Sequence, residues 1–250
     1  MCKVMGIVNV TPDSFSDGGQ FFKPEEAIRR AKNLIADGAD IIDLGGESTR
    51  PGATPIGWDE EWSRIEPVLT GLSSLVSRLK SFKISIDTYH PETAERAIKT
   101  GAHIINCVYA ESIPEMLKFL KGNDVELVAP AKCFETSASA SRRDADGTVK
   151  RLYLDPMIGF GTTREEDVEL LRSIPGLAKR GRVLVGASRK RIVKKLTGEK
   201  SSVGKNIGGN VAIAVWAAMQ GASVVRVHDV KETVQALRVI GCLEGKEESE

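Results

Sequence analysis

The sequence predicts an α/β protein of the TIM or (β/α)₈ barrel class, and three observations lead to this prediction. Short apolar runs alternate with amphipathic stretches along the whole chain, as repeated βαβ units require. Eight such runs fit into 250 residues, an ordinary length for a one-domain barrel. Polar residues follow nearly every run, at the strand end where barrels of this class carry their sites. We therefore predict a single domain over residues 1–250, with a charged, frayed tail at residues 244–250.

Most of the predicted strands are β-branched and apolar on both faces, because the strands of a barrel are covered on both sides. A doubly wound open sheet is the alternative. No Gly-x-Gly-x-x-Gly follows the first run, which disfavours the dinucleotide-binding form of that sheet. We expect the strands at Val4–Val10, Ile41–Leu44, Lys83–Ile86, His103–Asn106, Val125–Ala129, Leu152–Leu154, Val183–Val185 and Ser223–Val227.

The stretches between the strands predict helices with ordinary start and stop signals. Pro24–Ala36 begins with Pro and two Glu, which suit the positive end of a helix dipole, and Gly38 follows it. Gly208–Met219 is almost wholly apolar and small, so we expect it to be buried. The other expected helices are Trp58–Arg78, Pro91–Lys99, Arg164–Ser173 and Val230–Leu243.

The fifth crossover differs from the others. Residues 134–148 are polar, rich in Ser and Ala, and lack an apolar stripe, so we expect a shortened or irregular fifth crossover whose helix is short, irregular or absent. A flexible loop is the simplest interpretation. A missing helix is expected to leave barrel surface exposed.

The composition disfavours several classes of function. A net charge of +1 and an aromatic content of 5% argue against nucleic acid and anionic membranes as partners. No apolar run approaches the roughly 20 residues of a membrane helix, and no signal peptide precedes Val4, so we expect a cytoplasmic protein. The cysteines show no metal-binding spacing, and we expect free, buried thiols at Cys2, Cys107, Cys133 and Cys242.

Polar residues gather where the predicted strands end. One Asp after a strand is often only the N-cap of the next helix, and this is our interpretation of Asp229. Seven strand ends that converge with acids, amides and cations are hard to explain by capping alone, because buried charges are costly. These residues are Asn9, Asp43, Asp87, Asn106, Asp155, the Ser188-Arg189-Lys190 run, Arg226 and His228.

The residue types indicate the chemistry of the ligand. Asp and Asn together match the donor and acceptor edge of a polar heterocycle. The cationic donors Arg50, Arg226 and His228 suit phosphate groups. Asn9 and nearby carboxylates are oxygen ligands suited to Mg²⁺, which commonly accompanies a diphosphate. The set therefore predicts a site for a flat polar ring and a diphosphate.

Several motifs give the chain a resemblance to a known family. Residues 9–19 (NVTPDSFSDGG) and 43–52 (DLGGESTRPG) resemble the first two loops of dihydropteroate synthases. Shorter family motifs follow in order, and the resemblance covers nearly the whole chain. They are Ile86-Asp87-Thr88, Ile104-Ile105-Asn106, Leu154-Asp155-Pro156, Gly159-Phe160-Gly161, Ser188-Arg189-Lys190 and Arg226-Val227-His228-Asp229.

The resemblance implies a homodimeric barrel enzyme that condenses (7,8-dihydropterin-6-yl)methyl diphosphate with 4-aminobenzoate by an SN1-like step. It also implies three subsites and Mg²⁺, and Phe160 could equally be a core residue. The pterin pocket is expected at Asp87, Asn106, Val108, Asp155, Phe160, Lys190 and Arg226. The diphosphate site is expected at Asn9, Thr49, Arg50, Arg226 and His228, with Asn9 as metal ligand. The 4-aminobenzoate site is expected at Phe15, Thr49, Pro51, Phe160 and Ser188, and the catalytic residues are expected to be Asp17, Arg50 and Lys190.

Four features depart from the family pattern. Cys107 and Thr162 stand where Asp and Lys are usual, the fifth strand lacks the usual Met-His pair, and the strands that commonly precede the first barrel strand are absent. Two alternatives therefore stay open: a pterin-binding barrel without synthase activity, and a corrinoid-dependent folate methyltransferase. The intact loop motifs favour the synthase, because methyl transfer has no diphosphate to hold.

Overall fold

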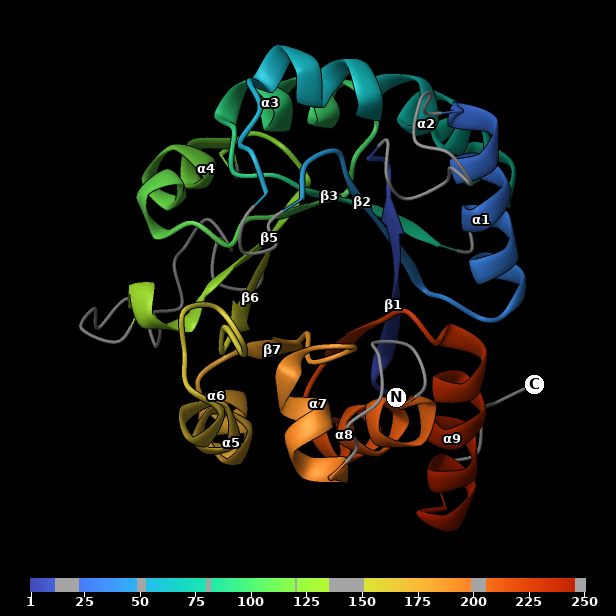
Figure 1. The fold of residues 1–250 in the computed structure, drawn as a ribbon. Coiled ribbons are helices and arrows are strands. Elements are labelled where there is room, and N and C mark those ends of the chain that lie inside the picture. Colours follow the sequence, from blue (N-terminus) through green and yellow to red (C-terminus); the bar gives the residue numbers. More distant parts are fainter. Residues whose placement is uncertain are drawn as a thin grey trace.

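The strands form a closed barrel in which each pairs in parallel with its neighbour in sequence, from β1 through β8 and back to β1. The computed structural model describes residues 1–11, 23–48, 53–79, 82–119, 121–134, 151–198 and 206–245. The helices lie outside the ring of strands (Figure 1). The predicted TIM-barrel class is therefore confirmed.

Every predicted strand is present, and every strand bound lies within one residue of its prediction. Two strands extend further than predicted and end on a carboxylate, because Asp87 pairs with Asn106 and Asp155 with Pro130 in the parallel ladder. The strands are β1 Lys3–Asn9, β2 Ile41–Gly45, β3 Lys83–Asp87, β4 Ile104–Asn106, β5 Glu126–Pro130, β6 Leu152–Asp155, β7 Arg182–Val185 and β8 Val224–Val227.

The longer helices were predicted, whereas three helices of five to seven residues were not. Such short helices span at most two turns, too few for an apolar period to appear in the sequence. The predicted group is α1 Pro24–Ala36, α2 Trp58–Leu79, α3 Pro91–Thr100, α5 Arg164–Arg172, α8 Ile207–Met219 and α9 Val230–Leu243. The missed group is α4 Ile113–Phe119, α6 Ile174–Ala178 and α7 Arg191–Thr197, and the 3₁₀ turns are η2 Ala110–Ser112 and η3 Ala131–Phe134. Among the described residues, no helix combines the length and the apolar character that a membrane span needs.

In the described part of the fifth crossover the chain forms the 3₁₀ turn η3, and residues 135–150 lie outside the described ranges. The expected exposure of barrel surface here is wrong. The outward side chains of β5 and β6 are buried: Leu127, Ala129, Leu152 and Leu154 are each at most 7% exposed. On this side Phe134 of η3 packs against the core, and Arg180 Nη2 donates a 2.9 Å hydrogen bond to its carbonyl oxygen.

The expectation that the apolar helix α8 is buried is also wrong in part. Asn210, Ala214 and Ala217 face the core, but Trp216 is 37% exposed and Met219 is 55% exposed. An isolated barrel can cover only one side of an outer helix, so composition alone did not reveal the exposed side of α8.

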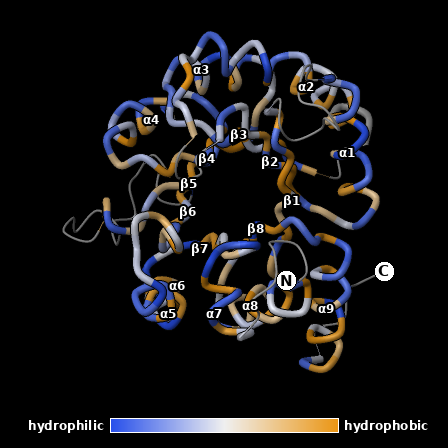
Figure 2. The backbone as a smooth tube through the Cα atoms, in the orientation of Figure 1, coloured by the Kyte–Doolittle hydropathy of each residue, from blue (hydrophilic) through white to orange (hydrophobic). Residues whose placement is uncertain are grey.

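The inward side chains of the strands form layers along the barrel axis, as expected for this architecture. An apolar layer fills the middle, and hydrophobic residues colour the strands in Figure 2. Its buried members are Met5, Ile41, Ile104, Val128, Tyr153, Leu184 and Val224. Two residues further along most strands the inward positions become polar, so the site lies on a packed apolar floor.

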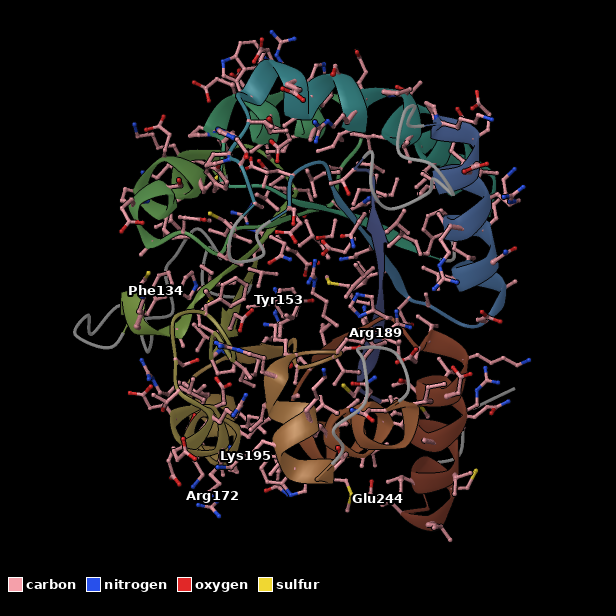
Figure 3. The ribbon with its side chains drawn as sticks, in the orientation of Figure 1. Phe134, Tyr153, Arg172, Arg189, Lys195 and Glu244 are labelled. Atoms are coloured by element: carbon pink, nitrogen blue, oxygen red, sulfur yellow. The ribbon has the colours of Figure 1, made fainter. Side chains whose placement is uncertain are left out.

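A charged network closes the opposite, N-terminal end of the barrel. Glu126 accepts hydrogen bonds from Lys83 Nζ at 2.7 Å and from Arg182 Nη1 at 2.6 Å. Arg182 also lies 4.0 Å over the ring of Tyr153, which Figure 3 labels inside the ring of strands. Glu126, Lys83 and Arg182 are thus paired at this end, which is typical of the stability face of a barrel.

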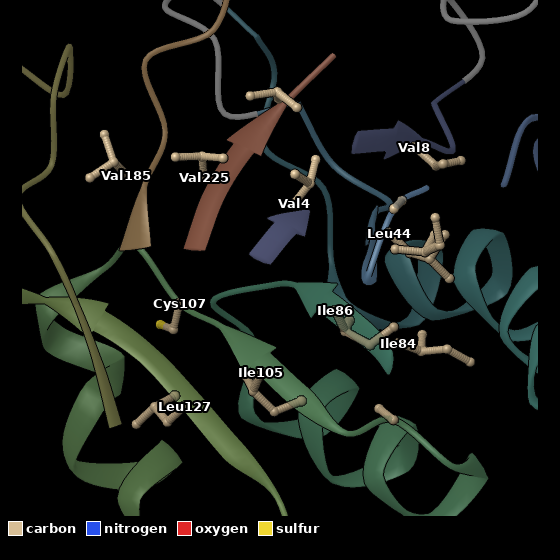
Figure 4. Close-up of a cluster of buried hydrophobic side chains, with 14 of the residues drawn as sticks. Val4, Val8, Leu44, Ile84, Ile86, Ile105, Cys107, Leu127, Val185 and Val225 are labelled. Atoms are coloured by element: carbon tan, nitrogen blue, oxygen red, sulfur yellow. The ribbon is translucent and has the colours of Figure 1, made fainter. Parts of the chain in front are cut away.

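The four cysteines are free, as predicted, but only Cys107 is buried. Its side chain is 1% exposed and lies among aliphatic side chains between the strands and the outer helices (Figure 4). Burial raises the pKa of the Cys107 thiol to about 12. The residue that departs from the family pattern is thus a neutral core residue.

Candidate active site

Arg226 of β8 bridges two carboxylates at the C-terminal end of the barrel. Its Nε donates to Asp43 Oδ2 at 2.6 Å and its Nη2 donates to Asp87 Oδ2 at 2.5 Å. Burial raises the pKa of Asp87 to about 7, although the nearby Arg226 opposes that shift. Burial alone lowers the pKa of Arg226, but Asp43 and Asp87 outweigh it, so the guanidinium stays charged.

Asp43 was noted at its strand end but not assigned a role. It is fully buried, its Oδ2 also faces Asn106 Nδ2 at 3.3 Å, and its Oδ1 has no hydrogen-bond partner in the described part of the chain. Asn106 Oδ1 is likewise buried and unpartnered. A charged residue in the middle of the apolar run Ile41–Gly45 was the signal that could have identified Asp43, because a buried charge needs a partner.

Asp155 and Lys190 form the second part of the site. Asp155 ends β6, and its Oδ1 accepts the Met157 amide hydrogen at 2.7 Å. Burial raises the pKa of Asp155, and the charge of Lys190 opposes this. Burial also lowers the pKa of Lys190 to about 8. Burial therefore shifts the pKa values of both residues, and such shifts are typical of functional sites.

Phe160 lies against Lys190 and outside the buried core. The Lys190 ammonium is 4.3 Å from the centre of the Phe160 ring and donates a 2.5 Å hydrogen bond to the Ile158 carbonyl oxygen. Phe160 is partly exposed and belongs to neither hydrophobic cluster, so the alternative of a core residue is not supported. Val108, two residues beyond β4, is also partly exposed.

Ser188, His228 and Asn9 lie on the same rim. Ser188 Oγ is 3.1 Å from His228 Nδ1 and accepts the His228 backbone N–H at 3.2 Å. A Cβ placed on Gly45 comes within 3.8 Å of both Asn9 Oδ1 and Asp87 Oδ2. The end of β1 is therefore close to the carboxylates that Arg226 bridges.

The interpretation of Asp229 as a helix cap is wrong for its side chain. Asp229 occupies the N-cap position of α9, but its side chain makes no capping hydrogen bond. Its two oxygens instead accept from Arg189 Nη2 at 2.7 Å and Asn210 Nδ2 at 2.9 Å. Figure 3 labels Arg189, which lies near α8 and α9. The carboxylate is bound instead by an Arg and an Asn from other segments of the chain, and a local sequence pattern could not show these contacts.

Five of the predicted site residues lie outside the residues that the structure describes. They are Phe15, Asp17, Thr49, Arg50 and Pro51. The other ten meet at the C-terminal rim, where side chains from β1, β3, β4, β6 and β8 and the loops after β4, β6, β7 and β8 converge. This arrangement offers acceptors and donors for a polar heterocycle beside cations for a phosphate group.

Comparison with known proteins gives this arrangement a family context. The family model for pterin binding enzymes matches residues 5–151 and 131–228. Dihydropteroate synthase from Escherichia coli K12 is 38% identical over 259 residues, which span 95% of this chain and 90% of that protein.

Solved structures agree with the sequence comparison. Xanthomonas albilineans dihydropteroate synthase with 4-aminobenzoic acid matches with a TM-score of 0.82 at 36% identity, over 97% of this chain and 93% of that one. Burkholderia cenocepacia dihydropteroate synthase complexed with 7,8-dihydropteroate matches with a TM-score of 0.82 at 32% identity, over 98% of this chain and 92% of that one.

Proposed function

Because the chain belongs to the dihydropteroate synthase family, we propose that it condenses (7,8-dihydropterin-6-yl)methyl diphosphate with 4-aminobenzoate. The products are 7,8-dihydropteroate and pyrophosphate. The observation that carries this proposal is the convergence of buried acids, an amide, Lys190 and Arg226 at the C-terminal rim of a family barrel. The relatives are named as synthases, so they favour neither a binding barrel without activity nor a corrinoid-dependent methyltransferase.

The pterin pocket is proposed at the buried acids and the amide. Buried acceptors need donors, and Asn106 Oδ1 and Asp43 Oδ1 have none among the residues that the structure describes. The N–H groups of a pterin ring supply them. Asp155 is proposed to accept from the amino-pyrimidine edge, and Lys190 is proposed to donate to a ring acceptor. Phe160 and Val108 are proposed as neighbours of the ring, with Asp87 and Arg226 closing the pocket.

The diphosphate subsite is proposed at Asn9, Arg226 and His228, with Thr49 and Arg50 assigned by resemblance alone. Mg²⁺ is proposed as the accompanying ion. Asn9 offers one amide oxygen near Asp87, while Arg226 already neutralises that carboxylate. Such a sparse donor set fits Mg²⁺ that binds with its diphosphate and keeps several waters. The bound ion supplies charge neutralisation of the leaving group.

The proposed reaction is an SN1-like displacement. The C–O bond breaks first, and pyrophosphate leaves with the bonding electrons, so that positive charge spreads from the methylene carbon into the pterin ring. The amine nitrogen of 4-aminobenzoate then forms the C–N bond with its lone pair and loses a proton. Buried carboxylates such as Asp155 are proposed to stabilise the cation electrostatically, and the reaction requires that water, which competes for the cation, is excluded.

The 4-aminobenzoate subsite is proposed beside Ser188 and Phe160. Ser188 lies within hydrogen-bond distance of His228, so this subsite adjoins the diphosphate subsite, as an attack on the methylene carbon requires. Phe15, Thr49 and Pro51 complete it by resemblance, and Asp17, Arg50 and Lys190 are the proposed catalytic residues.

Pyrophosphate release from the pterin diphosphate tests the function. We expect release to require both 4-aminobenzoate and Mg²⁺, with dihydropteroate as the product. Tight pterin binding without release contradicts the proposed activity and favours the binding barrel. A second titration, of Mg²⁺ with and without inorganic pyrophosphate, tests the ion, because we expect measurable Mg²⁺ binding only with pyrophosphate present.

A homodimer and a cytoplasmic location are also proposed. The helix α8 has no charged residue and exposes Ile207, Trp216 and Met219 to between 37% and 55%. Exposed apolar faces of this kind mark interfaces, and we propose a second copy of the chain as the partner. Light scattering of Trp216→Glu tests this, with Val239→Glu on α9 as the control. A wild-type monomer refutes the dimer.

A further inference from the structure

The turn between β6 and α5 has an unusual backbone conformation. Met157, Gly159 and Gly161 all have positive φ, at 65°, 77° and 71°. The left-handed region is unfavourable for Met, so the turn needs contacts that hold it in place.

A buried acid on α5 supplies those contacts. Asp167 is 2% exposed, and its Oδ1 accepts the Gly159 backbone N–H at 2.6 Å and the Thr162 hydroxyl at 2.6 Å. The Gly159 N–H also faces Thr162 Oγ1 at 3.1 Å. The N-terminus of α5 is capped separately by Thr163 and Glu166, so Asp167 is not needed for the capping box. Its hydrogen bonds fasten the turn.

The same turn holds the ammonium group of Lys190. The Ile158 carbonyl oxygen and the Phe160 ring flank Gly159, and both contact Lys190 Nζ. A Cβ placed on Gly159 comes within 3.0 Å of Lys190 Cδ, so the turn also packs along the side chain. A shift of the turn therefore shifts the Lys190 ammonium.

We propose that Asp167 and Thr162 are positioning residues for Lys190, through the Gly159–Phe160 turn. This inference rests on the proposed function for its catalytic consequence, but not for its structural one. It also gives a role to Thr162, one of the departures from the family pattern: its hydroxyl donates to Asp167 and accepts from the Gly159 amide, whereas the usual Lys has no acceptor for that amide.

Four charged groups from different elements face Lys190. They are Asp155 on β6, Asp87 on β3, Arg226 on β8 and Asp167 on α5. The two acids on the strands and Asp167 raise the pKa of Lys190, while Arg226 and, above all, burial lower it to about 8. Removing the charge of Asp167 therefore lowers the pKa of Lys190 further below 8.

Four variants separate the hydrogen bonds from the charge. Asp167→Asn keeps an acceptor for Gly159 but loses the charge, whereas Asp167→Ala loses both. Thr162→Val removes only the hydroxyl, and Thr162→Ser restores it. The matched control is Thr163→Ala, which removes the α5 cap and lowers the melting temperature by a few degrees without touching the turn.

The first readout is the NMR titration of the Lys190 side-chain nitrogen, assigned by its loss in Lys190→Arg. We expect Asp167→Asn to lower the pKa of Lys190, and Thr163→Ala to leave it unchanged. The second readout is kcat/KM for the pterin diphosphate. We expect a loss of about 10- to 100-fold for Asp167→Ala, as small displacements of positioned groups cost, and a smaller loss for Thr162→Val that Thr162→Ser rescues.

The pH profile distinguishes positioning from plain stability. The deficit of Asp167→Asn is expected to grow above pH 7, where Lys190 loses its proton earlier than in the wild type. The proposal is overturned if Asp167→Ala and Asp167→Asn match Thr163→Ala in both the Lys190 pKa and kcat/KM. A wild type without turnover refutes the proposed function instead, and the NMR titration then decides the positioning role alone.

Discussion

Replacing Arg226 by Met tests the electrostatic centre of the site. The guanidinium makes two hydrogen-bonded ion pairs, with Asp43 at 2.6 Å and with Asp87 at 2.5 Å, inside the barrel. Removing one partner of a buried pair leaves an uncompensated charge and costs about 3–5 kcal/mol. For a chain of this size each kcal/mol lowers the melting temperature by about 2–4 °C, so we expect a loss of about 6–20 °C at high pH.

The loss in Arg226→Met is expected to depend on pH, and the sign follows from Asp87. Its folded pKa of about 7 lies above the unfolded value of about 3.9, so the stability it contributes at low pH is lost as the pH rises through 7. Arg226 lowers the pKa of Asp87, so in the variant this loss continues above pH 7. The difference from wild type is therefore larger at pH 8.5 than at pH 6.

Thermal unfolding followed by circular dichroism at pH 6 and pH 8.5 makes the measurement. Arg189→Met is the control, because Arg189 pairs with the single carboxylate of Asp229 and its side chain is 34% exposed. We expect a smaller, less pH-dependent loss there. The double variant Arg226→Met with Asp87→Asn is expected to recover part of the stability. A loss in Arg226→Met that is equal at both pH values refutes the reasoning.

Three further predictions follow from other parts of the molecule. Asp155→Ala and Lys190→Ala are expected to abolish dihydropteroate formation while circular dichroism shows an intact fold, and unchanged turnover in either contradicts the site assignment. Glu126→Gln is expected to cost about 1.5–3 kcal/mol in urea unfolding at pH 7 without changing kcat, because it loses charged hydrogen bonds at the far end of the barrel. Burial raises the pKa of Glu126, but hydrogen bonds from Lys83 and Arg182 outweigh this and lower it. The loss of stability in Glu126→Gln is therefore expected to shrink as the pH falls through the folded pKa of Glu126. A loss that stays constant with pH contradicts this prediction. A thiol reagent at pH 8 is expected to label Cys242 first and Cys107 only after unfolding, as mass spectrometry of timed samples can check.

The barrel could be predicted from the sequence because its strands are short apolar runs, and polar residues follow nearly every run at its C-terminal end. Every strand bound was found within one residue, since a strand that is buried on both faces is apolar at most of its positions, with exceptions such as the paired Asp43 of β2 and Arg226 of β8. The short helices α4, α6 and α7 could not be predicted on the same basis. Their contacts with the barrel, and not a local period, determine that they form.

For the site residues, too, local sequence patterns predicted some features, whereas contacts between distant segments could not be predicted. A polar residue at or after the end of an apolar run can be recognised as a candidate site residue from the sequence. The residues found in this way include Asp87, Asn106, Asp155, Lys190 and Arg226. The sequence could not say which of these groups pair. Asp43 and Arg226 are separated by 183 positions, and the barrel closure that puts β8 beside β1 brings them within 2.6 Å.

This division also explains why Asp167 escaped notice. In the sequence it follows Glu165 and Glu166 and looks like one more acid in the first turn of a helix, which the helix dipole accounts for. Its neighbours are exposed, whereas Asp167 is buried and bonded to a turn that the Lys190 side chain contacts. These three consecutive acids thus differ in role, because Glu166 accepts from the Thr163 backbone N–H of the capping box, whereas Asp167 accepts from the Gly159 backbone N–H in the turn. The contact with that amide, rather than the residue type, connects α5 to the active site.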